Sequence, residues 1–528
     1  MNLVRALGSV GGLTLASRVL GLVRDSLFAR FVGASFASDA FLIAFRLPNM
    51  FRALFAEGAF SAAFIPMFNR KVAEEGGGLP AGLAFAEDVL SVLLPLLIVM
   101  TIVMEIFAWP ITYALSGGFK AVSEAQFAYA VGLSRITLPY LLLISLVSLF
   151  GGILNSLQKF WVSAAAPILL NLTLIVALLA FHETDPLFTG RNQAIAVTLS
   201  GVIQLGWLAW YCVNNDIRLR IKLPHVTPAV KKLLGLIGPA AAGAGAVQIN
   251  LVISTALAAS LLPEGSVSYI YYADRLNQLP LGLIGIGLGT VLLPTISRLL
   301  GAGNDAEAME TQNRGMELAL FFTLPATVAL IVCGVPIVAA LFQHGKFTAE
   351  DSLFTAQALA AFSIGLPSYI LVKVLTPGFY ARSDTRTPVR LATISIGLNI
   401  AFNLALIVPL RHMGPPLATA LSSTANVAML YISLRRRGHF VPDARLRRRV
   451  IRLAGAALLM GVALYFLNDR FTPYTTGPGL TRWLAMLVLV ATGGLVYAAA
   501  CFALRAYLPS DLRAMHRPRG GASIRKDP

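Results

Sequence analysis

Charged side chains are scarce in this chain. Asp, Glu, Lys and Arg make up 13% of its 528 residues, against about 25% in a typical soluble protein. Hydrophobic residues make up 57%, and so few charges could not cover that much apolar surface in water. The composition therefore excludes a soluble multidomain enzyme. Apolar residues also run continuously instead of alternating with polar ones, which argues against a transmembrane β-barrel.

Residue types that carry catalysis or bind metals are equally sparse. The three cysteines fall in apolar stretches without metal-ligand spacing, so we expect them to fill the core. The six histidines fall in loops or at the ends of apolar stretches, and no HExxH, P-loop or GxSxG motif occurs. The acidic pair Glu350-Asp351 is expected to be solvated. We therefore expect no enzyme and no cofactor, with any transport driven by the membrane potential, a monovalent cation or consumption of the product.

The chain does contain apolar stretches of about 20 residues, the length that spans a bilayer as a helix. They predict an all-α polytopic membrane protein with fourteen transmembrane helices. The approximate limits are 7–30, 37–68, 86–113, 126–155, 161–182, 192–213, 233–262, 267–297, 315–341, 353–380, 388–409, 414–434, 450–467 and 483–504.

The basic residues indicate an orientation for these helices. If the N-terminus is cytoplasmic, 28 of the 42 Lys and Arg residues fall in cytoplasmic segments and seven in external ones. The positive-inside rule then places both termini in the cytoplasm. The same asymmetry explains most of the net charge of +17, so we expect no nucleic-acid partner.

Leu-Pro pairs indicate an internal repeat. Leu47-Pro48 and Leu279-Pro280 lie 232 residues apart, and Leu138-Pro139 and Leu366-Pro367 lie 228 apart. Six predicted helices separate the copies, so their topology is parallel. The predicted parts are an N-terminal six-helix lobe (1–226), a C-terminal six-helix lobe (227–438), an extra helix pair (439–506) and a basic cytoplasmic tail (507–528).

Charges inside the predicted spans are the candidate functional residues. The basic ones are Arg18, Arg24, Arg46, Arg52, Arg135, Arg275 and Lys373; the carboxylates that share three of these spans are Asp25, Asp39, Glu57 and Asp274. Each basic residue costs about 2.5–3.5 kcal/mol or more at the bilayer centre. One interpretation is that the charges pair internally and hold the bundle together. The other is a cationic cavity, because arginine suits bidentate contact with phosphate or carboxylate oxygens.

Five segments carry a more specific pattern: SRVLGLVRD, SDAFLIAFRLPNMFRALFAEGAFSAAFIP, YYADRLNQLPLG, QHGKFTAEDS and KVLTPGFYARSDTRTP. With them, essentially the whole chain resembles the MurJ (MviN) lipid II flippase family of the MOP exporter superfamily. The resemblance implies fourteen helices, two lobes around a V-shaped cavity, alternating access and a place in the bacterial cytoplasmic (inner) membrane. It also implies that the last two helices form an apolar groove for a polyprenyl tail.

The resemblance also assigns roles to the charges. The expected substrate-binding residues are Arg18, Arg24, Asp25, Arg52 and Arg275. Among them, Arg18, Arg24 and Arg275 would bind the substrate pyrophosphate.

Other charges are expected to form gates or ion pairs: Asp39, Arg46, Glu57 and Asp274. Asp39 and Glu57 lie about 27 Å apart along one helix, too far to serve one phosphate. Some relatives bind sodium through carboxylates in the second lobe. Asn399 and Asn403 look like the corresponding positions, and because both are uncharged we expect no metal site there.

The expected partners are lipid II, an undecaprenyl-pyrophosphate-linked disaccharide-pentapeptide, and membrane lipids; the protein is expected to be a monomer. The expected function is transfer of lipid II from the cytoplasmic to the periplasmic leaflet. Three alternatives stay open: a flippase for another polyprenyl-pyrophosphate-linked glycan, a multidrug antiporter, and a membrane enzyme that processes polyprenyl phosphates. An antiporter for cationic drugs would favour an acidic cavity, and such an enzyme would need external carboxylates or histidines.

Overall fold

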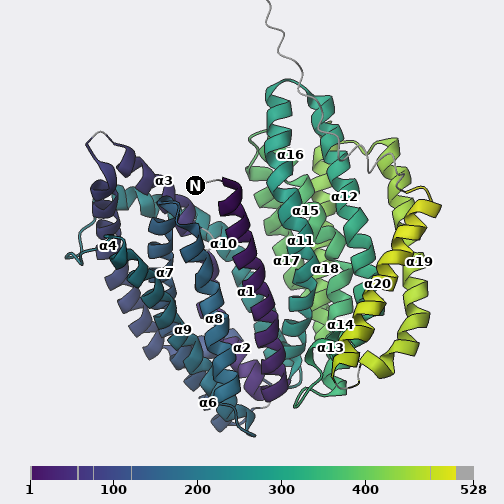
Figure 1. Ribbon diagram of the computed structural model, residues 1–528, viewed down its shortest axis with the longest axis horizontal. Coiled ribbons are helices and arrows are strands. Elements are labelled where there is room, and N and C mark those ends of the chain that lie inside the picture. The colour runs from purple at the N-terminus through teal and green to yellow at the C-terminus, as the bar shows by residue number, and fades with distance from the viewer. Residues whose placement is uncertain are drawn as a thin grey trace, which may run out of the picture. The chain divides into compact units, whose positions relative to one another are not determined.

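The computed structural model describes residues 3–55, 59–74, 76–120, 122–475, 477 and 479–506. Every regular element in these ranges is a helix, and they contain no strand (Figure 1). The all-α prediction is therefore confirmed.

The helices follow one another along the described chain with the bounds below. They are α1 (Leu3–Val32), α2 (Phe36–Phe55), α3 (Ala59–Ala73), α4 (Gly78–Ile106), α5 (Ala108–Ser116), α6 (Glu124–Thr137), α7 (Pro139–Ser156), α8 (Phe160–Ala180), α9 (Pro186–Asn214), α10 (Pro228–Leu261), α11 (Ser266–Gly301), α12 (Asp305–Val332), α13 (Gly334–Phe342), α14 (Ala349–Ile364), α15 (Leu366–Leu375), α16 (Pro377–Tyr380), α17 (Arg386–Leu410), the 3₁₀ turn η1 (Arg411–Met413), α18 (Gly414–Arg436), α19 (Ala444–Thr475) and α20 (Leu480–Ala503).

Nine helical segments of the described chain are long and apolar enough to cross a membrane, and the two parts of α11, Ser266–Gly282 and Gly287–Gly301, make a tenth candidate if they form one span. Some predicted spans consist of two short helices. Pro139 begins α7 and Pro367 lies in the first turn of α15, and proline has no N–H with which to continue a preceding helix. The chain is thus a multi-pass membrane protein, although these segments do not confirm the count of fourteen.

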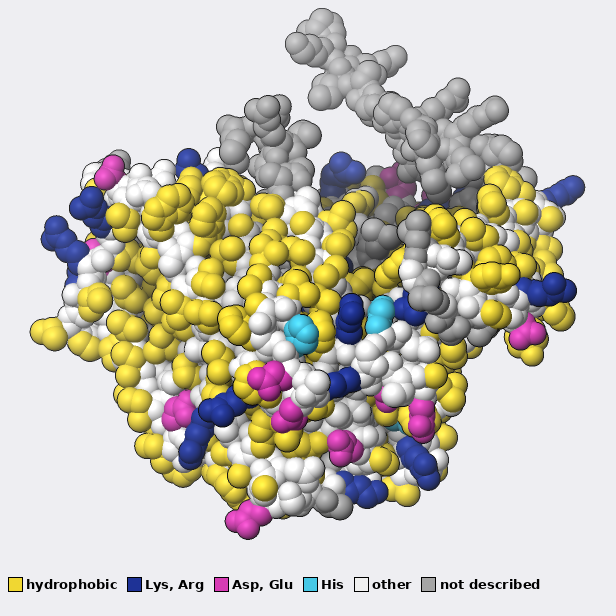
Figure 2. All heavy atoms as spheres, turned by 60° about the horizontal axis from the view of Figure 1, so that its bottom comes forward, with side chains coloured by type: hydrophobic (Ala, Val, Ile, Leu, Met, Phe, Trp, Pro, Cys, Tyr) yellow, Lys and Arg dark blue, Asp and Glu magenta, His cyan; other side chains and the backbone are white. Residues whose placement is uncertain are grey.

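Apolar side chains cover much of the outside of the helices. Ile106, Val408, Ile451 and Leu495 are each about two-thirds exposed or more. Figure 2 shows hydrophobic side chains over wide areas of one face, with charged side chains in separate groups among them. Such a surface is unfavourable in water but favourable in contact with lipid tails, which agrees with the membrane-spanning assignment.

The chain divides into two compact units. The first comprises Met1–Leu276, Leu341–Ala358 and Ala392–Ser422, and the second comprises Asn277–Ala340, Leu359–Leu391 and Ser423–Pro528. The two six-helix lobes, the extra helix pair and the tail stay predictions.

An apolar cluster in the first unit places the beginning of α11 beside α2. Ile43 of α2, Ala258 of α10, Val267 of α11 and Ile407 of α17 are buried in this cluster. Apolar residues gain little by moving from lipid into protein, so close packing and polar contacts must hold such helices together. The polar contacts of the same region are therefore informative.

The second unit buries a carboxylate that the sequence did not single out. Glu317 of α12 has only 3% of its side chain exposed and accepts hydrogen bonds from Arg314, one turn earlier, and from Arg449 of α19. Arg445 Nε lies 3.5 Å from Glu317 Oε2, and Arg314 also pairs with Asp443, just before α19. This ionic cluster attaches α19 to α12.

Candidate functional site

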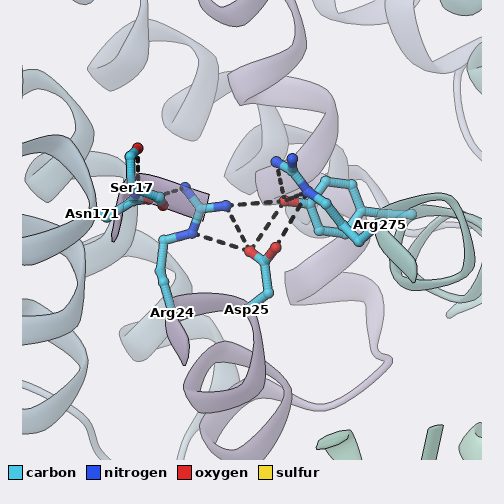
Figure 3. Close-up of polar contacts among 6 residues, drawn as sticks. Ser17, Arg24, Asp25, Asn171 and Arg275 are labelled. Atoms are coloured by element: carbon cyan, nitrogen blue, oxygen red, sulfur yellow. Dashed lines mark hydrogen bonds and ion pairs between the residues drawn. The ribbon is translucent and has the colours of Figure 1, made fainter. Parts of the chain in front are cut away.

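A network of polar side chains joins α1, α8 and α11 within the first unit (Figure 3). α11 begins in this unit, which includes the chain up to Leu276. The members of the network are Ser17, Arg24 and Asp25 of α1, Asn171 of α8, and Tyr271 and Arg275 of α11.

Asp25 is the central acceptor of this network. Its Oδ1 accepts from Arg24 Nη2 at 2.6 Å and Nε at 3.0 Å, and from the Tyr271 hydroxyl at 3.1 Å. Its Oδ2 lies 3.2 Å from Arg275 Nε. The carboxylate is 5% exposed, and sharing it between two guanidiniums offsets the cost of removing these charges from water.

Arg24 is held from three sides. Besides Asp25, its Nη1 donates to Asn171 Oδ1 at 3.1 Å and its Nη2 donates to the Tyr271 hydroxyl at 3.2 Å. Asn171 in turn donates to the backbone oxygen of Ser17 at 3.0 Å. The guanidinium therefore links α1, α8 and α11, and its position is fixed before any ligand binds.

Arg275 forms the exposed edge of the network. Its side chain is 37% exposed, whereas that of Arg24 is 9% exposed. Two guanidiniums around one carboxylate leave one net positive charge. An anion that approaches this network therefore meets Arg275 first.

The inner side of the network has no room for a ligand of any size. Arg24 and Asp25 border a cavity of about 10 Å³ that Phe28, Phe41 and Phe45 also line. This is about the volume that one water molecule requires. An anionic group would therefore have to approach both arginines from the Arg275 side.

Tyr271 is the member of this network, among those not predicted from the sequence, that contacts both arginines. Its hydroxyl accepts from Arg275 Nε at 3.1 Å and Nη2 at 3.0 Å, as well as contacting Arg24 and Asp25. Tyr271 precedes Arg275 by one helical turn, and residues four apart share a helix face. That four-residue spacing could have indicated from the sequence that Tyr271 lies beside Arg275.

Two of the predicted substrate-binding arginines lie outside these contacts. Arg18 is exposed on α1 and makes no hydrogen bond or ion pair within the described residues. Arg52 is half-buried on α2, and its Nε donates to Asn49 Oδ1 at 3.1 Å. The structure therefore brings together Arg24, Asp25 and Arg275 from the predicted set.

The predicted gating residues are spread over several places. Arg46 of α2 donates to the backbone oxygen of Leu251 in α10 at 3.2 Å. Asp274 is half-buried, next to Arg275 on α11. Glu57 lies outside the described residues. Asp39 is buried elsewhere in the first unit.

Asp39 caps the beginning of α11. Its Oδ2 accepts from the backbone N–H of Gly265 at 2.8 Å, and its Oδ1 accepts from the backbone N–H of Ser268 at 2.8 Å and from the Ser268 hydroxyl at 2.6 Å. Gly265 has a φ of +87°, a conformation that favours glycine. The reciprocal contact exists too, because Glu264 accepts from the backbone N–H of Phe36 at the start of α2 at 2.5 Å. Asp39 of α2 thus caps the start of α11, and Glu264, just before α11, caps the start of α2.

Asp351 corrects the expectation of a solvated acidic pair. It is only 8% exposed. Its Oδ1 accepts from the Tyr269 hydroxyl at 2.8 Å, and its Oδ2 accepts from the backbone N–H of Thr348 at 2.8 Å, just before α14. The expectation was wrong for this residue because a partner 82 positions away buries it.

Asn399 and Asn403, where no metal site is expected, belong to a neutral network. Asn403 Nδ2 donates to Asn399 Oδ1 at 2.9 Å and to Ser254 Oγ at 3.1 Å. Asn399 Nδ2 donates to Thr419 Oγ1 at 3.3 Å and to Ser422 Oγ at 3.2 Å. A hard cation takes several oxygen ligands. Here the amide nitrogens point at the neighbouring oxygens, and of the two asparagines Asn403 alone has a buried side-chain oxygen without a hydrogen-bond partner among the described residues, which is too few for such an ion. These residues do not fit a sodium ion.

Sodium should therefore not stabilise the purified protein. We expect the same thermal unfolding midpoint in NaCl and in KCl at equal ionic strength, because only an ion bound by the folded state shifts it. The KCl sample controls for charge screening. A midpoint that rises with sodium concentration but not with potassium would show that the folded chain binds sodium.

Known proteins of one family match this chain over nearly its whole length. The family model for lipid II flippase MurJ matches residues 28–484. The probable lipid II flippase MurJ of Rhizobium meliloti is 39% identical over 533 residues, which cover 100% of this chain and 98% of the relative. The lipid II flippase MurJ of Burkholderia cenocepacia is 36% identical, with 96% and 97% covered.

Solved structures give the same result. A lipid II flippase MurJ in an inward closed conformation superposes with a TM-score of 0.76 at 26% identity, covering 94% of this chain and 98% of the other. An inward-facing MATE transporter of the MOP superfamily has a TM-score of 0.65 at 17% identity, covering 80% and 94%, and shares the fold alone. Since the family model and the relatives cover most of its length, the chain belongs to the lipid II flippase MurJ family.

Proposed function

We propose that this chain flips lipid II from the cytoplasmic to the periplasmic leaflet of the bacterial inner membrane, as a transporter and not a catalyst. The observation that carries the proposal is the network of Arg24, Asp25 and Arg275, which holds a net positive charge among apolar helices. Pyrophosphate is the part of lipid II that such a network attracts, because guanidinium forks bind phosphate oxygens in pairs. The names of the relatives support the choice of lipid.

The binding step follows from the exposure of the arginines. Arg275 makes the first contact, and Arg18 adds a positive charge about 10 Å from Asp25 along α1. Bound pyrophosphate neutralises these like charges and so favours a state in which the two proposed lobes close around the headgroup. The ligand shifts the equilibrium by the difference in its affinity for the two states. The prenyl tail stays in lipid, where Tyr465 and Phe466 of α19 offer exposed apolar rings.

Fourteen spans and cytoplasmic termini complete the proposal. Pairing α2 with α3, α6 with α7, and α14 with α15, and counting α5, α13 and α16 with their neighbours, groups the helices into fourteen spans. This number is even, which supports both termini on one side. The excess of basic residues in alternate loops supports the cytoplasm as that side.

Thiol labelling in intact cells tests this topology. Glu183→Cys, in a proposed external loop, should react with an impermeant reagent, and Arg436→Cys, at the cytoplasmic end of α18, should react only after lysis. Both positions are exposed in the structure, so a difference in labelling reports sidedness. The native cysteines are buried and are replaced in the background protein. Labelling of Arg436→Cys in intact cells would reverse the orientation.

Depletion in the native bacterium tests the function. Loss of the protein should stop exposure of lipid II on the outer face, while lipid II accumulates inside and the cells lyse. The matched control is restoration by the wild-type gene at native expression. If lipid II exposure stays normal and a different polyprenyl-linked glycan accumulates, that glycan and not lipid II is the substrate.

A further inference from the structure

The hydroxyl of Tyr271 joins both arginines of the network. It accepts from Arg24 Nη2 at 3.2 Å and from Arg275 Nη2 at 3.0 Å and Nε at 3.1 Å, and it donates to Asp25 at 3.1 Å. A phenol has one proton to donate and two lone pairs to accept with, so the two Arg275 nitrogens share one lone pair, Arg24 takes the other, and no capacity is left unused. The guanidinium carbon of Arg275 also lies 5.0 Å from the centroid of the Tyr271 ring.

These contacts set the separation of the two guanidiniums. Because one oxygen contacts a nitrogen of each, those nitrogens lie at most about 6 Å apart. Arg24 is also held by Asn171 and Asp25, whereas half-exposed Arg275 is oriented by Tyr271 and by one contact to Asp25. Without the hydroxyl, Arg275 would keep only its contact with Asp25 and its packing on the aromatic ring, neither of which fixes its distance from Arg24.

We propose that Tyr271 is a specificity-determining positioning residue that makes the site prefer a lipid diphosphate over a lipid monophosphate. This inference rests on the proposed function. Two linked phosphoryl groups engage both guanidiniums at once, each through a fork. One phosphoryl group can touch both guanidiniums across this short distance, but its three terminal oxygens are too few to give each guanidinium a fork of its own. The preference therefore depends on keeping the two arginines together.

Binding to the purified full-length chain in lipid nanodiscs tests this. The probes are a polyprenyl diphosphate and the polyprenyl monophosphate of the same chain length. Wild type should bind the diphosphate at least about tenfold more tightly. Tyr271→Phe should weaken diphosphate binding about tenfold, the size expected for a hydrogen bond to a charged group, and change monophosphate binding less than twofold.

Tyr272→Phe is the matched control. Tyr272 is the next residue on α11 and is fully buried, and its hydroxyl has no hydrogen-bond partner among the described residues. Removing it takes away the same atom without touching the network, so both affinities should stay as in wild type. A general effect of losing a buried tyrosine hydroxyl would instead appear in both variants.

The double variant Tyr271→Phe/Arg275→Lys shows whether Tyr271 acts through Arg275. An ammonium lacks the guanidinium fork, so the preference for diphosphate should be as low in Arg275→Lys alone as in the double variant. If the two substitutions instead lower the preference for diphosphate independently, so that the double variant shows the product of the two single effects, Tyr271 does not act through Arg275. An unchanged preference in Tyr271→Phe would also overturn the positioning role. Equal binding of both probes by wild type overturns the inference and leaves the flippase proposal intact, whereas binding of neither overturns the flippase proposal.

Discussion

Arg24→Ala is expected to abolish lipid II transport, with a fall of at least about 100-fold. The substitution removes the guanidinium that pairs with buried Asp25 and binds Asn171 and Tyr271. Asp25 then keeps Arg275 as its ionic partner, but the proposed pyrophosphate site loses one of its two guanidiniums. Two hydrogen bonds to a charged group, at about 1.5–3 kcal/mol each, account for a change of this size. Arg24→Lys should recover only part of the activity, because an ammonium cannot reach Asp25 and Asn171 with fixed fork geometry. Complementation of a conditional mutant at native expression measures the effect.

Arg30→Ala provides the matched control. Arg30 lies six residues later on the same helix and is exposed, with its guanidinium carbon 5.6 Å from the Phe31 ring centroid. Its loss removes the same charge from α1 without disturbing the network, so complementation should stay normal. Quantifying each variant in the membrane separates loss of function from loss of protein. Normal complementation by Arg24→Ala at wild-type levels would end the assignment of the pyrophosphate site to this network.

Asp39→Ala is expected to shift the conformational equilibrium of the transporter toward the outward-open state. The carboxylate accepts three hydrogen bonds from Gly265 and Ser268 at the start of α11. Asp39 lies at the external end of the predicted span 37–68, so an opening on that side is the change expected to break these contacts. Hydrogen bonds to charged groups contribute about 1.5–3 kcal/mol each, so losing all three favours that state by about 100-fold or more. Reaction rates of cysteines placed along α1 beside Arg18 should change accordingly. Affinity for lipid II in the inward-facing state should change little.

Asp185→Ala is the control for Asp39→Ala. Asp185 also caps a helix, accepting from the backbone N–H of Leu187 at 2.9 Å, but it is exposed and acts within its own helix α9. Water replaces an exposed cap at small cost, and the cysteine reaction rates should match wild type. If Asp39→Ala also matches wild type in these rates and instead weakens lipid binding, Asp39 belongs to the substrate site and not to a gate.

The sequence predicted the helical class and the candidate charges for the same reason: in lipid, apolar length and unpaired charge are both strongly constrained. Arg24, Asp25 and Arg275 stand out because each is costly in an apolar span. Tyr271 does not, because a tyrosine in such a span costs little and its role depends on contacts with α1. Its partners Arg24 and Asp25 are about 250 positions away in the chain.

The burial of two acids, Glu317 and Asp351, was not predicted for the same reason: their partners are distant in the sequence. Glu317 lies at the very start of the predicted span 315–341, next to a polar segment, and its burial becomes evident only when Arg449, 132 positions later, is placed beside it. Asp351 is buried by Tyr269 in the same way. Positions of helices follow from local patterns, whereas the burial of a charge depends on pairs of segments that only the tertiary structure brings together.

The ionic cluster at Glu317 has a consequence for shortening the chain. A version ending before α19 would lose Arg445 and Arg449 and leave Glu317 with Arg314 alone, on a surface of α12 that α19 had covered. Deleting the last two helices is therefore expected to destabilise the part of the chain that remains. A stable truncated chain would also need apolar residues in place of both Glu317 and Arg314, since charged side chains facing lipid are costly.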